Sequence, residues 1–243
     1  MVASVVQSIA SRLNALCYGL LTRSVVRKHF SQQEIKAAGY FSQCGQDKWV
    51  AEVLCKDAAA KTFVDIGAND GISFSNTWHL ERKLGWTGIA VEPIPEVFDK
   101  LKANRACSVI NGCVGAESGT ARFQVVSGYA EMLSGLVDEY DPRHQKRILD
   151  EVSQHGGTCR EIDAVCYNFN ELLDRHGIGK VDYLNIDAEG AEYSILKSID
   201  FSRFEIAVVG VENNYADCRF PLLMKKKGYR LHSIVGDEFY VRQ

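Results

Sequence analysis

The sequence lacks several features that would point to a function at once. Its 243 residues hold 28 Lys and Arg against 31 Asp and Glu, so there is no basic excess for binding nucleic acid. No two of the eight cysteines are spaced as C-x-x-C, which excludes the common zinc-finger patterns. Their scatter favours free thiols in a reducing, cytoplasmic compartment over a disulfide framework. The chain has no internal repeat, and its length suits one good-sized domain with an appendage.

Residues 1–39 have no acidic side chain before Glu34 and no uncharged apolar run long enough to span a membrane. Apolar residues recur every three or four positions, which predicts an amphipathic helical extension. Three roles stay open for it: packing on the domain, contact with a membrane surface or a partner through residues 1–30, or organelle targeting. The apolar positions are Val2, Val5, Val6, Ile9, Leu13, Leu16 and Leu20, and the basic ones are Arg12, Arg23, Arg27 and Lys28.

Residues 40–243 alternate short apolar runs with helical patterns. Near-continuous apolar strands predict an α/β domain whose parallel sheet is covered by helices on both faces. Apolar runs flanking Gly236-Asp237 predict a C-terminal antiparallel hairpin. Residues 127–157 interrupt the alternation, and we expect an insertion near the site or a lid. The predicted strands are 62–66, 88–91, 108–114, 183–186, 206–211, 229–234 and 238–242, and the predicted helices are 75–84, 93–104 and 191–198.

The strongest functional signal is FVDIGANDG at residues 63–71, where a buried strand enters a glycine-rich turn. Gly67 and Gly71 allow a positive φ and the close approach of a ligand. A dinucleotide-binding turn has a further, middle glycine and receives a pyrophosphate. Here Asp65 and Asp70 border the turn, and carboxylates repel a pyrophosphate but suit a ligand with an ammonium and a sulfonium. The turn therefore predicts S-adenosylmethionine, with a turn-stabilising role as the alternative for Asp65.

Glu92 ends the strand that follows the turn. An acid at this place in a Rossmann-type crevice can accept hydrogen bonds from both hydroxyls of a ribose. No Arg or Lys follows it immediately, so a 2′-phosphate would have no partner. The spacing of this acid and the glycine turn supports an adenosine-containing cofactor.

Taken together, these motifs resemble the FkbM-type methyltransferases over about residues 40–242. The resemblance implies a Rossmann-like, seven-stranded, mostly parallel sheet with one antiparallel strand. It also implies S-adenosylmethionine as cofactor and methylation of a hydroxyl on a sugar, glycan or natural product. The matching segments are SQCGQD (42–47), FVDIGANDG (63–71), SNT (75–77), LE (80–81), GWTG (85–88), VEP (91–93), LNIDAEGAE (184–192), VE (211–212) and GY (228–229). The candidate cofactor-binding residues are Asp65, Gly67, Asn69, Gly71, Asn76, Glu92, Pro93, Cys113 and Val114.

Two further strand ends carry acids that could activate the acceptor. Asp187 and Glu189 follow the predicted strand 183–186, and Glu212 and Asn213 follow the next strand. Adjacent strand ends in an open α/β sheet face the same crevice. One interpretation is a Mg²⁺ or Mn²⁺ site formed by Asp187, Glu212 and Asn213. In the other, Asp187 or Glu189 acts as general base or anchors the acceptor. In the third interpretation, these residues only cap the helices that follow them.

Two rival functions come from other classes. One is an NAD-dependent oxidoreductase that modifies sugars, against which Asp65 argues because it borders the phosphate-binding turn. The other is a catalytically silent, methyltransferase-like binding module. The acids at 187–192 and 212–213 argue against it, since a silent site has no need for them.

Overall fold

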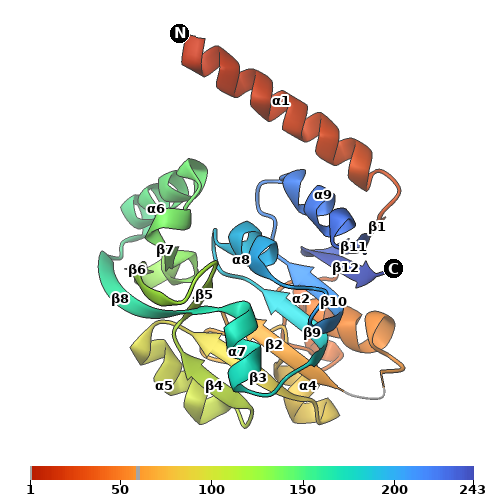
Figure 1. The fold of residues 1–243 in the computed structure, drawn as a ribbon. Coiled ribbons are helices and arrows are strands. Elements are labelled where there is room, and N and C mark those ends of the chain that lie inside the picture. The colour runs from red at the N-terminus through yellow and green to blue at the C-terminus, as the bar shows by residue number, and fades with distance from the viewer. Residues whose placement is uncertain (1, 59–60) are drawn as a thin grey trace.

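The computed structural model describes residues 2–58 and 61–243, with the backbone alone for residues 2–8. Strands and helices alternate along most of the chain and build two sheets (Figure 1). The eight cysteines are free thiols, as predicted. In chain order the elements are α1 (Val2–Thr22), β1 (Val26–Arg27), α2 (Gln32–Ala37), α3 (Gln46–Trp49), η1 (Val50–Leu54), β2 (Thr62–Ile66), α4 (Trp78–Leu84), β3 (Thr87–Glu92), α5 (Pro95–Asn104), β4 (Ser108–Asn111), β5 (Cys113–Gly115), β6 (Gly119–Val126), η2 (Gly128–Leu133), β7 (Gly135–Leu136), η3 (Val137–Glu139), α6 (Pro142–His155), β8 (Cys159–Asn168), α7 (Phe169–Arg175), β9 (Lys180–Ile186), α8 (Glu192–Ser198), β10 (Glu205–Val211), α9 (Arg219–Lys226), β11 (Tyr229–Val235) and β12 (Asp237–Arg242).

The main sheet has the strand order β1-β11-β12-β10-β9-β2-β3-β4. Strand β12 pairs antiparallel with both of its neighbours, and the other pairings are parallel. The α/β class and the C-terminal hairpin are therefore confirmed. The predicted count of seven strands is wrong, because the two-residue strand β1 adds an eighth at the edge beside β11.

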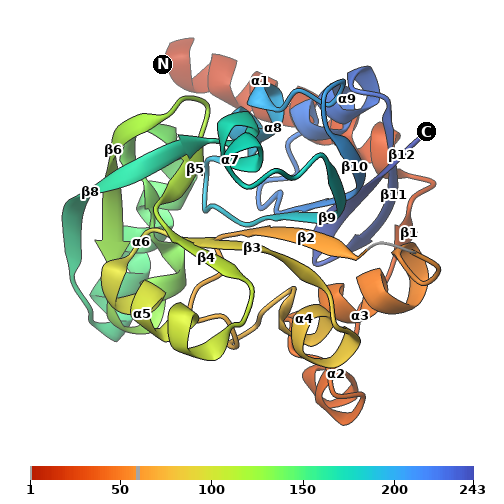
Figure 2. The same cartoon turned by 60° about the horizontal axis from the view of Figure 1, so that its bottom comes forward.

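Helices cover both faces of the main sheet. Figures 1 and 2 show α3, α4 and α5 on one face and α7, α8 and α9 on the other. The central strands β2, β9 and β10 are buried along almost their whole length, as their near-continuous apolar sequence predicts. This packing holds the carboxyl ends of the central strands in fixed positions.

A second, four-stranded sheet has the order β5-β8-β6-β7. The prediction of a single strand over 108–114 is wrong, because β4 joins the main sheet and β5 joins the second one. A Cβ on Gly112 between them would lie 2.6 Å from the carbonyl oxygen of Val165, so the chain needs glycine where it changes sheets. Residues 127–157, predicted as an insertion, form η2, β7, η3 and α6 between β6 and β8.

The predicted N-terminal helix forms as α1, and residues 32–37 add the short helix α2. In Figure 1, α1 is a long rod beside the body of the molecule. Within the described ranges, no helix has both the length and the apolar character needed to cross a bilayer.

Candidate functional site

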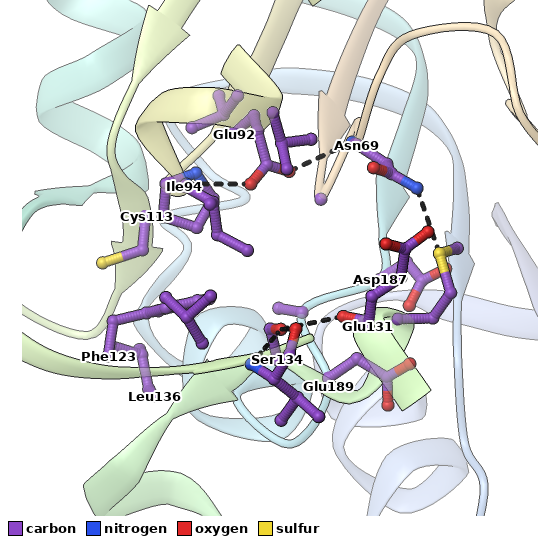
Figure 3. A pocket seen from close by; sticks show the side chains of 18 of the residues that line it. Asn69, Glu92, Ile94, Cys113, Phe123, Glu131, Ser134, Leu136, Asp187 and Glu189 are labelled. Atoms are coloured by element: carbon purple, nitrogen blue, oxygen red, sulfur yellow. Dashed lines mark hydrogen bonds between the residues drawn. The ribbon is translucent and has the colours of Figure 1, made fainter. Parts of the chain in front are cut away.

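A cavity of about 260 Å³ lies where β2, β3 and β9 of the main sheet end against the second sheet (Figure 3). Of the predicted cofactor-binding residues, six line it, and so do both predicted catalytic residues. Its walls are apolar on the side of the second sheet and acidic beside β3 and β9. The predicted lining residues are Gly67, Asn69, Glu92, Pro93, Cys113, Val114, Asp187 and Glu189.

Glu92 is almost fully buried at the end of β3. Its two carboxylate oxygens accept hydrogen bonds from the backbone N–H groups of Asn69 (3.1 Å) and Ile94 (2.9 Å). Burial raises the pKa of Glu92 to about 7, although both N–H donors act in the opposite direction. Each oxygen keeps a second lone pair, so the side chain can also accept from hydroxyl groups in the cavity.

Gly67 is required by the protein's own packing. Its φ is +84°, and a Cβ at this position would lie 1.7 Å from the backbone carbonyl oxygen of Asp187. Beside this contact, the Asp187 N–H donates to the Ile66 carbonyl at 3.0 Å. The glycine therefore lets the end of β2 come close enough to the end of β9 to position Asp187.

Gly71 lies outside the cavity lining. Its φ is +80°, and a Cβ would lie 2.7 Å from both Leu101 Cδ1 and Arg105 Cγ. This glycine is explained by side-chain packing behind the turn, whereas the sequence suggested room for a ligand.

Asp65 and Asn76 also lie outside the lining, in a buried polar network. Asp65 accepts from the Thr77 hydroxyl and from Asn185 Nδ2 (2.9 Å), and Arg105 Nη1 lies 3.9 Å from it. Asn76 Nδ2 donates to Asn185 Oδ1 at 3.1 Å. The charge of Asp65 is therefore balanced inside the protein by Arg105, a partner that the sequence analysis missed.

Asp70 does not face the cavity either. It accepts from the backbone N–H groups of Ile72 (2.8 Å) and Ser73 (2.7 Å) and from the Ser73 hydroxyl. This is an Asx-type turn, the structural role considered above for Asp65. The acids that face the cavity near the turn are Glu92, Asp187 and Glu189.

Asp187, Glu189 and Glu212 form a cluster in which one carboxylate oxygen of each lies within 4.8 Å of the others. We call these three residues the carboxylate cluster. Burial, with added repulsion from Glu192, raises the pKa of Glu189 to about 8. Burial and repulsion between cluster members raise the pKa of Glu212 to about 11 and that of Asp187 well above its ordinary range. The sequence prediction that the ends of β9 and β10 bring acids together is confirmed.

The carboxylate cluster has little compensation from cationic groups. Glu189 Oε2 is buried and has no hydrogen-bond partner among the described residues, and His144 Nδ1 lies 3.7 Å from it. Burial lowers the pKa of His144, so this imidazole is neutral at pH 7. The repulsion within the cluster must therefore be relieved by bound protons or by a cation that enters the site.

Asn213, predicted as a metal ligand, is engaged elsewhere. Its Nδ2 donates to Glu238 Oε1 at 2.9 Å and to the Asp217 carbonyl at 3.1 Å. Its Oδ1 accepts from the Asp217 N–H at 2.8 Å. The third carboxylate of the cluster is therefore supplied by Glu189, while Asn213 holds the loop after β10.

A second pocket of about 160 Å³ lies on the other side of the loop that follows β9. Arg143 pairs with Asp141 (2.7 Å), and its guanidinium lies 4.0 Å from the ring centroid of Tyr215. Arg219 is arranged in the same way, with Asp217 at 2.6 Å and the Tyr193 ring at 4.6 Å. Glu212 of the carboxylate cluster lines this pocket, so the cluster lies between the two hollows.

The sequence analysis missed the part of the cavity wall that the second sheet supplies. Phe123, Val125 and Leu136 line the cavity from β6 and β7, and Met132 lines it from η2. The alternation of Phe123 and Val125 with polar residues was the available signal for a half-buried strand. Asn69 Nδ2 lies 3.0 Å from Met132 Sδ, so η2 touches the glycine-rich turn across the cavity (Figure 3).

A cavity at the carboxyl ends of parallel strands, with an acid ending the second strand, is typical of Rossmann-like proteins that bind a nucleoside. Residues 65–231 match the family model for the methyltransferase FkbM domain. The chain therefore belongs to the FkbM methyltransferase family, and the resemblance seen in its motifs is confirmed.

Among known proteins, the chain is similar to methyltransferase sdnD of Sordaria araneosa, with 28% identity over 163 residues. This match covers 59% of the chain and 62% of that protein. Among solved structures it is similar to methyltransferase FkbM from Methylobacillus flagellatus KT, with 13% identity and a TM-score of 0.43 over 75% of this chain and 43% of that one. A METTL16 methyltransferase domain aligns with 14% identity and a TM-score of 0.39, covering 94% of this chain and 93% of that one.

Proposed function

We propose that the protein transfers a methyl group from S-adenosylmethionine to a hydroxyl oxygen of a sugar, glycan or natural product. The observation that carries the proposal is the carboxylate cluster, because it lies between a nucleoside-sized cavity and a polar second pocket. Membership of the FkbM family supports methyl transfer as the class of reaction.

The cavity residues fit the cofactor. Glu92 can accept from the ribose hydroxyls with the lone pairs that its backbone partners leave free. Val114, Phe123 and Val125 provide apolar walls suited to an adenine ring. Asp187 and Glu189 place carboxyl oxygens at the far side of the cavity, and in their ionised form these would attract a sulfonium. When bound, the cofactor supplies an electrophilic methyl group on sulfur.

The chain's own contribution is to remove the proton from the acceptor. An alkyl hydroxyl is almost fully protonated at neutral pH, so its oxygen needs a base or a cation beside it. Glu189 suits the role of base because its pKa of about 8 lies close to physiological pH. Its unpartnered Oε2 is free to take the hydroxyl proton while the acceptor oxygen attacks the methyl carbon and the methyl–sulfur bond breaks.

The carboxylate cluster is also where a divalent cation would bind. Three carboxylates within 4.8 Å are hard oxygen ligands of the kind that Mg²⁺ or Mn²⁺ prefers. A bound cation would lower the pKa of the acceptor hydroxyl directly. This second mechanism uses Asp187, Glu189 and Glu212, without Asn213.

The second pocket is where we propose that the acceptor binds. Both of its arginines are paired with an aspartate, so it offers no free positive charge to an anionic acceptor. Carboxylate oxygens from Asp141, Asp217 and Glu212 can accept hydrogen bonds from hydroxyl groups. A neutral molecule with several hydroxyls fits this lining best.

Residues 127–157 fit the role of a lid. They supply Ser127, Glu131, Met132, Ser134 and Leu136 to the cavity wall, and Met132 contacts Asn69 on the opposite side. We expect this contact to open when cofactor enters and to close again over it.

The test is a methyl-transfer assay with labelled S-adenosylmethionine and a panel of neutral polyhydroxylated acceptors, run in excess chelator and then with Mg²⁺ or Mn²⁺. At saturating S-adenosylmethionine, Asp187→Asn and Glu189→Gln should each lower turnover by about 10²–10⁴-fold, a loss that weaker cofactor binding cannot explain. Glu205→Gln, at the opposite end of β10 from Glu212, is the matched control and should keep full activity.

The two mechanisms separate in this assay. Full activity in chelator would show that the carboxylates remove the proton, and recovery of activity only with added cation would show that a metal site is needed.

Mass spectrometry of co-purified ligand tests the class of protein. NAD would indicate an oxidoreductase, and cofactor binding without transfer to any acceptor would favour a silent binding module.

A further inference from the structure

Helix α1 packs on the rest of the chain with its polar side. Asn14 Nδ2 donates to the Ala216 carbonyl at 3.0 Å, and its Oδ1 accepts from the Cys218 N–H at 2.9 Å. One turn later, the Tyr18 hydroxyl donates to Glu238 Oε1 at 2.6 Å. A surface helix of a globular protein normally turns its apolar stripe towards the core, so this orientation is reversed.

The apolar stripe of α1 points away from the protein instead. Ile9 is 53% exposed, Leu13 61%, Leu16 62% and Leu20 60%. These four residues, which we call the outer stripe, are spaced three or four apart and therefore lie on one side of the helix. A row of large exposed apolar side chains marks a surface that binds something apolar.

Charge identifies what the outer stripe contacts. Four basic residues and no acidic ones lie in the first 33 residues, although the whole chain has more acids than bases. The basic residues Arg12, Arg23, Arg27 and Lys28 are all exposed. A second copy would bring the same positive charge to the contact, whereas an anionic surface would be attracted to it. Apolar and basic side chains together are the composition of a helix that lies in a membrane interface.

We infer that α1 docks the protein on the surface of an anionic lipid bilayer. The outer stripe lies in the boundary between headgroups and acyl chains, and Arg12 and Arg23 contact anionic headgroups, whereas Arg27 donates to the Thr22 hydroxyl on the side of the domain. Asn14 and Tyr18, on the opposite side of the helix, keep the folded domain attached above the membrane. This inference rests on α1 and the basic residues that follow it, and it is independent of the proposed enzymatic function.

The test is flotation of the full chain with two kinds of vesicle, phosphatidylcholine alone and phosphatidylcholine mixed with phosphatidylglycerol. We expect binding to the mixed vesicles, weakened by salt because part of the attraction is electrostatic. The double variant L13Q/L16Q should lose binding by at least about tenfold, since two of the inserted apolar side chains are removed. Ala15→Gln, at an exposed position on another side of the helix, is the matched control and should bind as the unmodified chain does.

A second double variant tests the charge. R12Q/R23Q should reduce binding to the mixed vesicles and bring the binding to the two lipid compositions closer together. Circular dichroism and thermal unfolding establish that each variant is folded. Absence of vesicle binding by the unmodified chain would overturn the inference. So would a dimer in solution that L13Q/L16Q dissociates, because the outer stripe would then be an interface between copies.

Discussion

Gly67→Ala is the substitution that most directly tests how the fold positions the site. The new Cβ would lie 1.7 Å from the Asp187 carbonyl oxygen, so the ends of β2 and β9 must separate by at least about 1 Å to restore a normal contact. That movement breaks the hydrogen bond from the Asp187 N–H to the Ile66 carbonyl (3.0 Å) and strains the one from Gly67 to the Val91 carbonyl (3.1 Å). Each bond contributes about 0.5–1.5 kcal/mol, and a left-handed alanine costs about 1–2 kcal/mol.

The expected loss in the free energy of unfolding is therefore about 2–5 kcal/mol, measured by urea denaturation. Gly85→Ala is the matched control, because Gly85 also has a positive φ of +72° but a Cβ added to it would meet no atom within 4 Å. It should lose only the conformational part, about 1–2 kcal/mol. Methyl transfer by Gly67→Ala should fall further than its unfolded fraction explains, because Asp187 is displaced. Equal destabilisation by the two variants would refute the reasoning.

Two more predictions concern buried acids. Because the pKa of Glu92 is raised to about 7, its ionised fraction grows as the pH rises from 6 to 8, and cofactor affinity measured by calorimetry should increase by about tenfold over that range. Glu92→Gln should remove this pH dependence, and a slope unchanged in the variant would contradict the assignment. Arg105→Met should lower the free energy of unfolding by about 3–5 kcal/mol, because it leaves Glu81 and Asp65 buried without their cation. Arg122→Met, at an exposed ion pair, is its control and should cost less than about 1 kcal/mol in the same measurement.

The main sheet could be predicted because its strands carry the signal in their own sequence. Strands β2, β9 and β10 are buried on both faces, so each carries a run of apolar residues, interrupted in β2 and β9 by buried polar side chains such as Asp65 and Asn185. The second sheet could not be found in this way, since β6 and β8 are exposed on one face and alternate apolar with polar residues. Strand β1 has two exposed residues, and only its pairing with β11, some 200 residues later, makes it a strand.

The candidate site likewise has residues whose positions could be predicted from the sequence and residues whose surroundings could not. Glu92 and Asp187 could be predicted as cavity residues, because a residue directly after a parallel strand lies at the carboxyl edge of the sheet wherever the rest of the chain goes. The surroundings of Asp65 and Asn213 could not be predicted. Asp65 faces Arg105, which is 40 residues away in the sequence, and Asn213 is held by Glu238. Whether a polar side chain is already engaged by a buried partner depends on tertiary packing, and the local sequence does not reveal that packing.

The carboxylate cluster lowers the stability of the folded state. That loss explains why contacts within the protein hold the surrounding loops in place. A carboxyl group whose pKa is raised on folding binds more protons in the folded state, so it lowers stability as the pH rises from its ordinary value through the raised one. For Glu189 that interval runs from about 4.5 to about 8. Glu192 adds to the repulsion, but it also accepts from the N–H groups of Ala188 and Gly190 and so fixes the loop that carries Glu189, while Gly67 lets β2 approach Asp187. A proton from the acceptor, or a cation that enters the cluster, relieves this repulsion. The electrostatic cost that the folded state carries therefore favours the binding of that proton or cation, which methyl transfer requires.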